Sequence, residues 1–272
     1  MGRLDTTNPL AGVSWKTVAT TGDTAGGNIA DHWHIYALGF HWIAFSANYA
    51  RDCYLLKLDR DFNRVALVTV VQNSPQPTND LFMVAEPDGV TVGIFLPGVG
   101  HTLYRFDGQG TARGTAQIGG GAYSHANGSS AIPIKSGFAV LATETLNPVS
   151  TSAVKVLVYD DSWRPVSNAT LISQDRANYA MASGVLLESG YTIVNLRVRD
   201  NVNPRGVNTP PSGGDDSGSI AQLVVTPNGQ VTSRQTLVAF GGNRPHTTLV
   251  GNLVITAWDG SGQAFMRIDR VN

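Results

Sequence analysis

The stretch CYLLKLDRDFN at residues 53–63 decides the fold, because it reads as an apolar β-strand that closes on a small polar turn. The same pattern returns at TLYRFDGQGTA (102–112), VKVLVYDDSWRP (154–165), IAQLVVTPNGQ (220–230) and AFMRIDRVN (264–272). An Asp closes the run in four of the five copies and Thr226 in the other, at intervals of 48, 53, 66 and 43 residues. A period of this size with strand patterning is typical of a β-propeller with one four-stranded blade per repeat.

Three further strand-like runs accompany each of the first four copies. In the first repeat they are WHIYAL (33–38), WIAFSA (42–47) and VALVTVV (65–71). The fifth repeat lacks its last run, whereas the N-terminal segment SWKTVATTG (14–22) resembles the outer runs of the other repeats. We expect this segment to complete the fifth blade, which would close the ring and leave no exposed sheet edge. The prediction is an all-β, five-bladed propeller in which residues 1–272 form a single domain.

Composition narrows the classes of function. Of the 272 residues 42% are hydrophobic and only 14% charged, and 30 are Gly, which suits short buried strands joined by turns. A net charge of −1 without a basic cluster argues against a nucleic-acid partner. No run approaches the roughly 18 apolar residues of a membrane span, and no apolar signal segment opens the sequence, so we expect a soluble protein. The lone Cys53 is expected to be a buried thiol.

The connections differ in length between the two ends of the predicted strands. Turns after the first and third run of a repeat are short, and the recurring Asp is expected to accept hydrogen bonds from the amides of its own turn. The long connections, among them Phe240–His246 and the Pro- and Gly-rich segment Arg199–Ser219, emerge on the other face because strand directions alternate. Variable loops on a rigid scaffold commonly carry binding or catalysis, so we expect a site on that face.

Polar residues open the innermost strand of every predicted blade on the loop-bearing face. They are Asp31 and His32, Asn79 and Asp80, His125 and Asn127, Asn178 and Tyr179, and Arg244 and His246. With Trp258 at the rim, this ring suits a neutral polyhydroxylated ligand such as an oligosaccharide, because polar groups bond hydroxyls and an indole packs on a sugar face. The alternative is that these groups satisfy one another and buried water in the channel.

A metal site is a second hypothesis for the same ring. His32, His125 and His246 come from different repeats, and three imidazoles would suit zinc or another transition ion. A Ca²⁺ or other ion in the central channel is a further alternative. The sequence contains neither an HExxH motif nor a Cys pair, so local spacing does not support a metal.

The segment NIADHWHIYALGFHWIAFSA (28–47) resembles the opening of the arabinanase and β-xylosidase-like glycoside hydrolases, which are five-bladed propellers. The resemblance implies that Asp31 holds the place of the general base, and that His246 in RPHTT (244–248) lies near a central ion. The sequence departs from the family because His32 stands where Pro is usual. The third and fourth repeats also place no carboxylate at their innermost strands, and Glu144 lies elsewhere than the family's general acid.

Three functions remain open from the sequence. The first is a sugar-binding propeller with one central site. The second is a glycosidase-like enzyme in which Asp31 works with Asp80 or Glu144, a reaction that needs two carboxyls roughly 5 to 10 Å apart. The third is a protein-binding scaffold that uses the 199–219 loop.

Overall fold

The computed structural model describes residues 2–4, 13–24, 26–78, 81–96, 100–118, 130–146, 151–172, 177–200, 218–260 and 263–271. The chain divides into two compact units, the first comprising Met1–Leu96 and Thr102–Thr115 and the second Pro97–His101 and Ala116–Asn272. Strands dominate both units, and the helical structure among the described residues is one 3-10 turn, η2 (Thr21–Asp23). The all-β class is confirmed, while a single domain over the whole chain stays a prediction.

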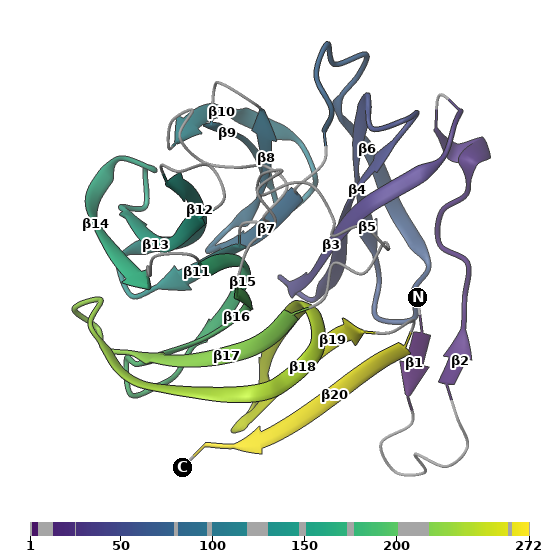
Figure 1. Ribbon diagram of the computed structural model, residues 1–272. Coiled ribbons are helices and arrows are strands. Elements are labelled where there is room, and N and C mark those ends of the chain that lie inside the picture. Colours follow the sequence, from purple (N-terminus) through teal and green to yellow (C-terminus); the bar gives the residue numbers. More distant parts are fainter. Residues whose placement is uncertain are drawn as a thin grey trace. The chain divides into compact units, whose positions relative to one another are not determined.

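Two four-stranded sheets carry the first two repeats (Figure 1). One has the order β3 (Ile29–Ala37), β4 (Phe40–Ala47), β5 (Asp52–Leu58), β6 (Arg64–Val71), and the other β7 (Leu81–Glu86), β8 (Gly89–Leu96), β9 (Gly100–Asp107), β10 (Ala112–Ile118). Neighbouring strands of the first sheet are antiparallel. Trp42 and Leu55 of the first sheet share one buried cluster with Met83 and Val92 of the second. Apolar burial between these two sheets therefore forms the core of the first unit.

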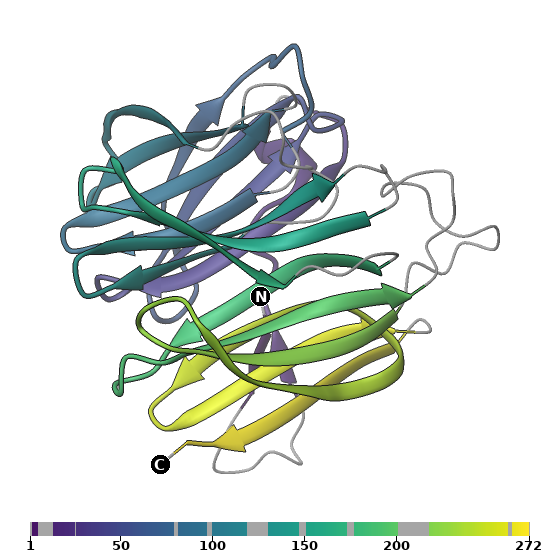
Figure 2. The same ribbon diagram turned by 60° about the vertical axis from the view of Figure 1, so that its left-hand side comes forward.

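The second unit holds the remaining three repeats in two sheets. The first has the order β11 (Ser130–Ile134), β12 (Gly137–Leu146), β13 (Thr151–Tyr159), β14 (Pro165–Ile172). The second has the order β15 (Ala177–Leu186), β16 (Thr192–Asp200), β17 (Gly218–Val225), β18 (Val231–Val250), β19 (Leu253–Gly260), β20 (Gln263–Arg270). Figure 2 shows the strands of this six-stranded sheet, coloured green to yellow, side by side. Leu141 and Val154 of one sheet pack in a buried cluster with Leu196 and Leu223 of the other.

The long strand β18 joins the fourth and fifth repeats without a loop. Its first part pairs with β17 and its second part, from Asn243, pairs with β19. The loop predicted over Phe240–His246 is therefore wrong. Glycine explains the difference, because Gly241 adopts a φ of 79° and a Cβ on Gly242 would lie 2.6 Å from Ile220 Cγ1. The ladder shifts register there and pairing resumes on both sides of the bend, which a sequence rich in Gly does not reveal.

The N-terminal segment differs from the expected outer strand. β1 (Gly2–Leu4) pairs antiparallel with β2 (Val13–Trp15), residues 16–20 carry no regular secondary structure, and η2 follows. One continuous strand over 14–22 is therefore not observed. Closure of a five-bladed ring by this segment stays a prediction.

Polar contacts explain why the segment after β2 does not continue as a strand. Lys16 Nζ donates to Asn63 Oδ1 at 2.7 Å, and Arg64 Nη1 pairs with Asp23 Oδ1 at 2.7 Å. These contacts attach the segment to the turn that joins β5 and β6 and to the start of β6 itself. Val18 packs beside them against a buried cluster of the first sheet.

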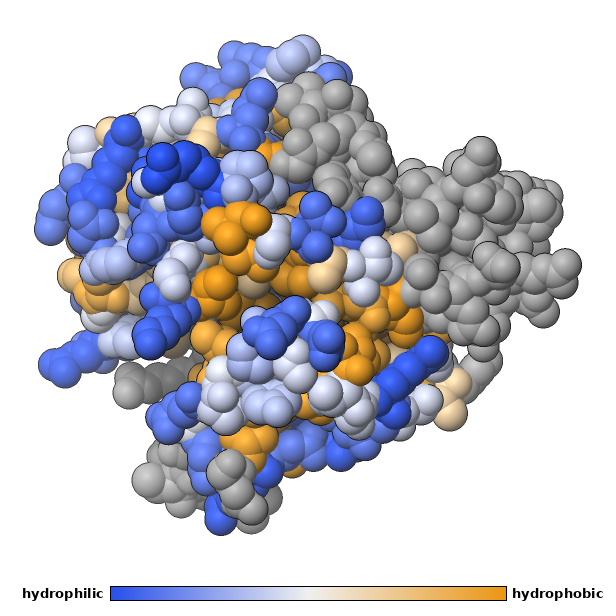
Figure 3. Space-filling view, turned by 90° about the vertical axis from the view of Figure 1, so that its left-hand side faces the viewer, coloured by the Kyte–Doolittle hydropathy of each residue, from blue (hydrophilic) through white to orange (hydrophobic). Residues whose placement is uncertain are grey.

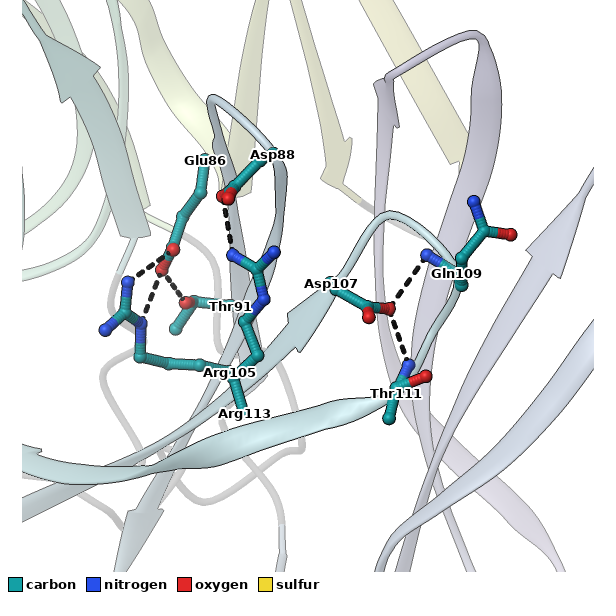
Figure 4. Close-up of polar contacts among 8 residues, drawn as sticks. All are labelled: Glu86, Asp88, Thr91, Arg105, Asp107, Gln109, Thr111 and Arg113. Atoms are coloured by element: carbon teal, nitrogen blue, oxygen red, sulfur yellow. Dashed lines mark hydrogen bonds and ion pairs between the residues drawn. The ribbon is translucent and has the colours of Figure 1, made fainter.

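The recurring Asp closes its turn through the backbone, as predicted. The acceptor in each turn is Oδ1, and the amides that donate to it belong to residues 61 and 63 for Asp59, 109 and 111 for Asp107, and 162 and 164 for Asp160, all at 2.8–2.9 Å. Thr226 Oγ1 accepts a similar bond from the Gln230 amide at 3.1 Å. The turn amides lower the pKa of Asp107, which marks a structural role. Figure 4 shows this turn.

A buried carboxylate lies at the same end of the second sheet (Figure 4). Glu86 is 3% exposed and receives a bidentate contact from Arg105, with Nε to Oε1 at 3.1 Å and Nη2 to Oε2 at 2.7 Å. Thr91 donates to the same carboxylate. Its neighbour Asp88 forms an exposed pair with Arg113. Glu86 therefore stabilises the end of the sheet opposite the long connections.

Replacing Arg105 by Ala is expected to lower the free energy of unfolding by about 2 kcal/mol, because the buried Glu86 carboxylate loses its charged donor. The matched control is Arg113→Ala, which removes an exposed pair and should change stability little. Urea unfolding followed by circular dichroism measures both. Equal effects in the two variants would contradict the structural role of Glu86.

Candidate functional site

Asp31 lies at a β-bulge near the start of β3. Ile29 pairs with Ala47 and His32 with Phe45, so two residues of β3 face one residue of β4. That one residue, Ser46, donates its hydroxyl to the Asp31 carbonyl at 3.4 Å. A bulge re-aims side chains and is common beside functional sites. The Asp31 side chain is accordingly exposed at the end of the sheet where its long connections emerge.

Backbone amides from two repeats fix the Asp31 carboxylate. Oδ1 accepts a hydrogen bond from the His32 amide at 3.0 Å, and Oδ2 accepts one from the Leu81 amide at 3.2 Å. Leu81 is the first residue of β7, the first strand of the second repeat. The carboxylate therefore joins the start of β3 to the start of β7.

The connections around Asp31 are tied together by buried polar contacts. Asp52 is fully buried and accepts the Asn73 amide on Oδ1 at 2.8 Å. Thr78 donates its amide to the Ala50 carbonyl at 2.7 Å and its hydroxyl to the Asp52 carbonyl at 3.0 Å. Arg51 Nη1 donates to a carbonyl of the same connection. These hydrogen bonds therefore hold together the two connections at the loop end of the first sheet.

His32 and His34 share one face of β3, as their alternation predicted. The Nε2 atom of His34 lies 3.0 Å from Nδ1 of His41, and the two rings are stacked. Burial against this neighbour, with the charges of His41 and His32, lowers the pKa of His34 to about 4. His34 is therefore neutral near pH 7.

The fifth repeat presents Arg244 and His246 on the bend of β18. Both side chains are exposed, Pro245 between them is buried, and Arg244 adopts a φ of 44°. His246 pairs through its backbone with Ala257 of β19. The next residue, Trp258, is half-buried and stacks on Phe265 with ring centroids 5.9 Å apart. The indole thus has a cross-strand partner from β20 in this structure.

Buried polar groups hold the bend of β18 in place. Arg197 is 1% exposed and donates from Nη1 to Asn243 Oδ1 at 3.1 Å. Asn195 Nδ2 donates to the hydroxyls of Thr247 at 2.8 Å and Thr256 at 2.9 Å. The middle of β16 is therefore attached to the strand that carries His246.

Sequence reasoning missed Asp259, an exposed carboxylate at the end of β19. Its backbone pairs with Asn243, so it lies at the bend that also carries Arg244. The signal was present in the sequence, because Asp259 directly follows Trp258 at the close of a predicted strand. Asp259 gives the fifth repeat a carboxylate at its loop end.

Several predicted site residues lie outside what the structure describes. Asn79, Asp80, His125 and Asn127 fall outside the described residues, as do most of the 199–219 loop and the side chains of Glu144, Asn178 and Tyr179. The part of the chain that is described holds no group of three or more His, Cys, Asp or Glu able to bind a metal ion. The three-histidine metal site includes His125 and stays a prediction.

Other expectations have clearer outcomes. Cys53 is fully buried, and burial together with the charge of Asp31 raises the pKa of its thiol. None of the described residues forms a helix long and apolar enough to span a bilayer. The face drawn in Figure 3 mixes hydrophilic and hydrophobic residues. The absence of a nucleic-acid partner stays a prediction.

Comparison with known proteins places the fold. No protein-family model and no curated protein matches the sequence. A protein of unknown function from Dyadobacter fermentans has a similar structure, with 13% identity, a TM-score of 0.62 and coverage of 89% of this chain and 79% of that one. An α-L-arabinofuranosidase from Lactobacillus brevis matches at 9% identity and TM-score 0.57, covering 90% of both chains. A thermostable family-43 glycoside hydrolase matches at 10% identity and TM-score 0.51, covering 90% and 89%. The chain thus has a propeller-like all-β fold similar to that of glycoside hydrolases.

The histidine pair of the first sheet predicts a measurable pH dependence. The pKa of His34 in the folded protein lies below its usual 6.5, so the unfolded chain takes up the proton first. The stability that depends on neutral His34 is therefore present above about pH 6.5 and lost as the pH falls toward 4. Histidine NMR titration should give a midpoint near 4 for His34, and His34→Gln should flatten the stability profile over that range. A midpoint near 6.5 would contradict the contact with His41.

Proposed function

We propose that this protein is a carbohydrate-binding or carbohydrate-processing propeller with one polar site on its loop-bearing face. The observation that carries the proposal is Asp31, an exposed carboxylate fixed at a bulge by amides of β3 and β7. Similarity of the fold to an arabinofuranosidase and a family-43 glycoside hydrolase supports the choice of a saccharide as ligand.

The residues of the predicted ring suit hydroxyl groups. A carboxylate accepts hydrogen bonds from sugar hydroxyls, and His32, Arg244 and His246 offer exposed donors at the openings of the first and fifth repeats. The proposal includes five blades, closed into one domain by N-terminal residues, so that these openings surround a common axis. Asn79, His125, Asn127, Asn178 and Tyr179 would complete the ring, with Trp258 at its rim.

Hydrolysis is the catalytic form of the proposal. Asp31 would act as general base, with Asp80 or Glu144 as general acid on the other side of the scissile bond. Asp259 adds a third candidate acid, because it occupies the loop end of the fifth repeat. Binding without turnover is the outcome if no second carboxyl lies within reach of the bond.

Asp31→Asn tests both forms of the proposal. With arabino- and xylo-oligosaccharides as probes, we expect hydrolysis to fall by roughly 10²-fold or more, since a general base is lost. If the protein only binds, calorimetry should show weaker affinity. Asn keeps one acceptor of the two that the His32 and Leu81 amides use, so the melting temperature should fall modestly, and activity and affinity are measured well below it.

The matched control is Asp61→Asn, which removes the same charge from an exposed turn at the opposite end of the sheet. Unchanged turnover and affinity in Asp31→Asn would exclude Asp31 from the site. A wild-type protein that neither binds nor cleaves any member of a broad oligosaccharide panel would overturn the proposed function.

A further inference from the structure

The connection between β4 and β5 contains a rare backbone conformation. Asn48, Tyr49 and Ala50 have φ angles of 51°, 54° and 58°, so three successive residues are left-handed and none is glycine. This region is disfavoured for L-residues because Cβ approaches the following carbonyl oxygen. Non-glycine residues persist there only when their surroundings over-determine the backbone, and such strain gathers at functional sites.

Three chain segments hold this turn. The Arg51 amide closes it on the Ala47 and Asn48 carbonyls at 3.1 Å each. Asn28 Oδ1 accepts the Tyr49 amide at 2.9 Å, and the Ala50 carbonyl accepts both the amide and the hydroxyl of Thr78. The turn is thus fixed by residues before β3, by its own backbone and by the connection that follows β6.

Gly27 allows this close arrangement. A Cβ at position 27 would lie 2.8 Å from the Asn48 Cα atom, a distance that real side chains do not reach. The two loop segments therefore contact each other through bare backbone, and the left-handed turn has little room to relax.

The strained turn presents Tyr49 to solvent. Its side chain is 76% exposed, whereas Ala47 and Ala50 on either side are buried. The ring packs in none of the buried clusters of the described residues, so core packing does not explain an aromatic residue here. Most exposed neighbours at this end of the sheet are polar, namely Asp31, His32, Arg51, Gln72 and Asn73, and the apolar ones are Ile29, Pro75 and Pro77.

Tyr49 lies at the same end of the first hairpin as Asp31. From the pair that Ala47 forms with Ile29, Tyr49 lies two residues out in the turn and Asp31 lies two residues into β3, so one ligand would need several sugar units to reach both. One rigid aromatic ring beside a polar carboxylate site suits a sugar, whose C–H face stacks on the ring while its hydroxyls meet polar groups. A protein partner would favour several aromatic or Arg anchors close together, whereas Tyr49 is the single exposed aromatic residue described at this end of the first sheet.

We propose that Tyr49 is a stacking platform for a sugar unit of a neutral oligosaccharide bound beside Asp31. This inference rests on the proposed function and adds a subsite to it. The strained turn fixes the backbone from which the ring projects, which reduces the ordering cost of binding.

The variants Tyr49→Gly and Tyr49→Trp distinguish the contribution of the aromatic ring from that of the turn backbone. Glycine removes the ring and also relieves the left-handed strain, so the melting temperature should stay level or rise. Affinity for xylo- or arabino-oligosaccharides, measured by calorimetry, should fall about five- to tenfold in the Gly variant. Trp should keep or strengthen binding. Tyr191→Gly is the control, because it removes a partly exposed Tyr from a turn of the second unit.

The outcomes distinguish this inference from the proposed function. A lower affinity in Tyr49→Gly at unchanged stability, with Tyr191→Gly like wild type, supports the platform. Unchanged affinity in Tyr49→Gly, while the wild type binds oligosaccharide, overturns the platform and leaves the proposed function standing. No binding by the wild type to any probe overturns the proposed function and the platform together.

Discussion

Burial on both faces of the middle strands is the constraint on which the rest of the structure depends. All seven residues of β5 are buried, and so are seven of the eight in β8. A sheet with two apolar faces must be covered on both, so a single four-stranded repeat is not stable alone. In the first unit each sheet covers one face of the other, and Val18 and Ala19 pack on the second face of the first sheet. The outer strand β10 remains largely exposed and β6 partly so. The need to cover both apolar faces of each sheet therefore explains why the four-stranded repeat recurs along the chain.

The two ends of the sheets differ in their turns and in their polar contacts. At one end, short turns are closed by side chains that accept backbone amides, as at Asp107, and a buried carboxylate is neutralised by Arg105. Single non-glycine residues with positive φ occur in these short turns too, at Leu38, Phe62 and Trp163. The other end, in contrast, has the bulge at Asp31 and a run of three such residues at 48–50. Satisfied polar groups stabilise the first end. Stored strain and exposed polar groups at the second end are typical of a functional surface.

The sequence predicted most strands, the turn chemistry of the recurring Asp and the burial of Cys53, because these depend on local patterns of apolar and small polar residues. It failed at β18, where Gly241 and Gly242 read as a loop but serve a bend with close packing on Ile220. The segment 14–22 also differs from the single strand expected there, because Lys16 and Asp23 bind residues of the first sheet and the chain leaves its pairing with β1. Both failures reflect long-range contacts that residue type alone does not encode.

Within the site, Asp31 was predictable and Tyr49 was not. An Asp that opens an innermost strand is visible in the sequence, whereas a positive φ at Tyr49 depends on Asn28 and Thr78, which lie 21 and 29 residues away along the chain. The geometry also explains how Asp31 can brace the fold and still meet a ligand. A carboxylate has about four acceptor positions, and the His32 and Leu81 amides occupy two. Because the side chain is exposed, the others face solvent, so the same bonds that join two strands orient the remaining acceptors for a hydroxyl.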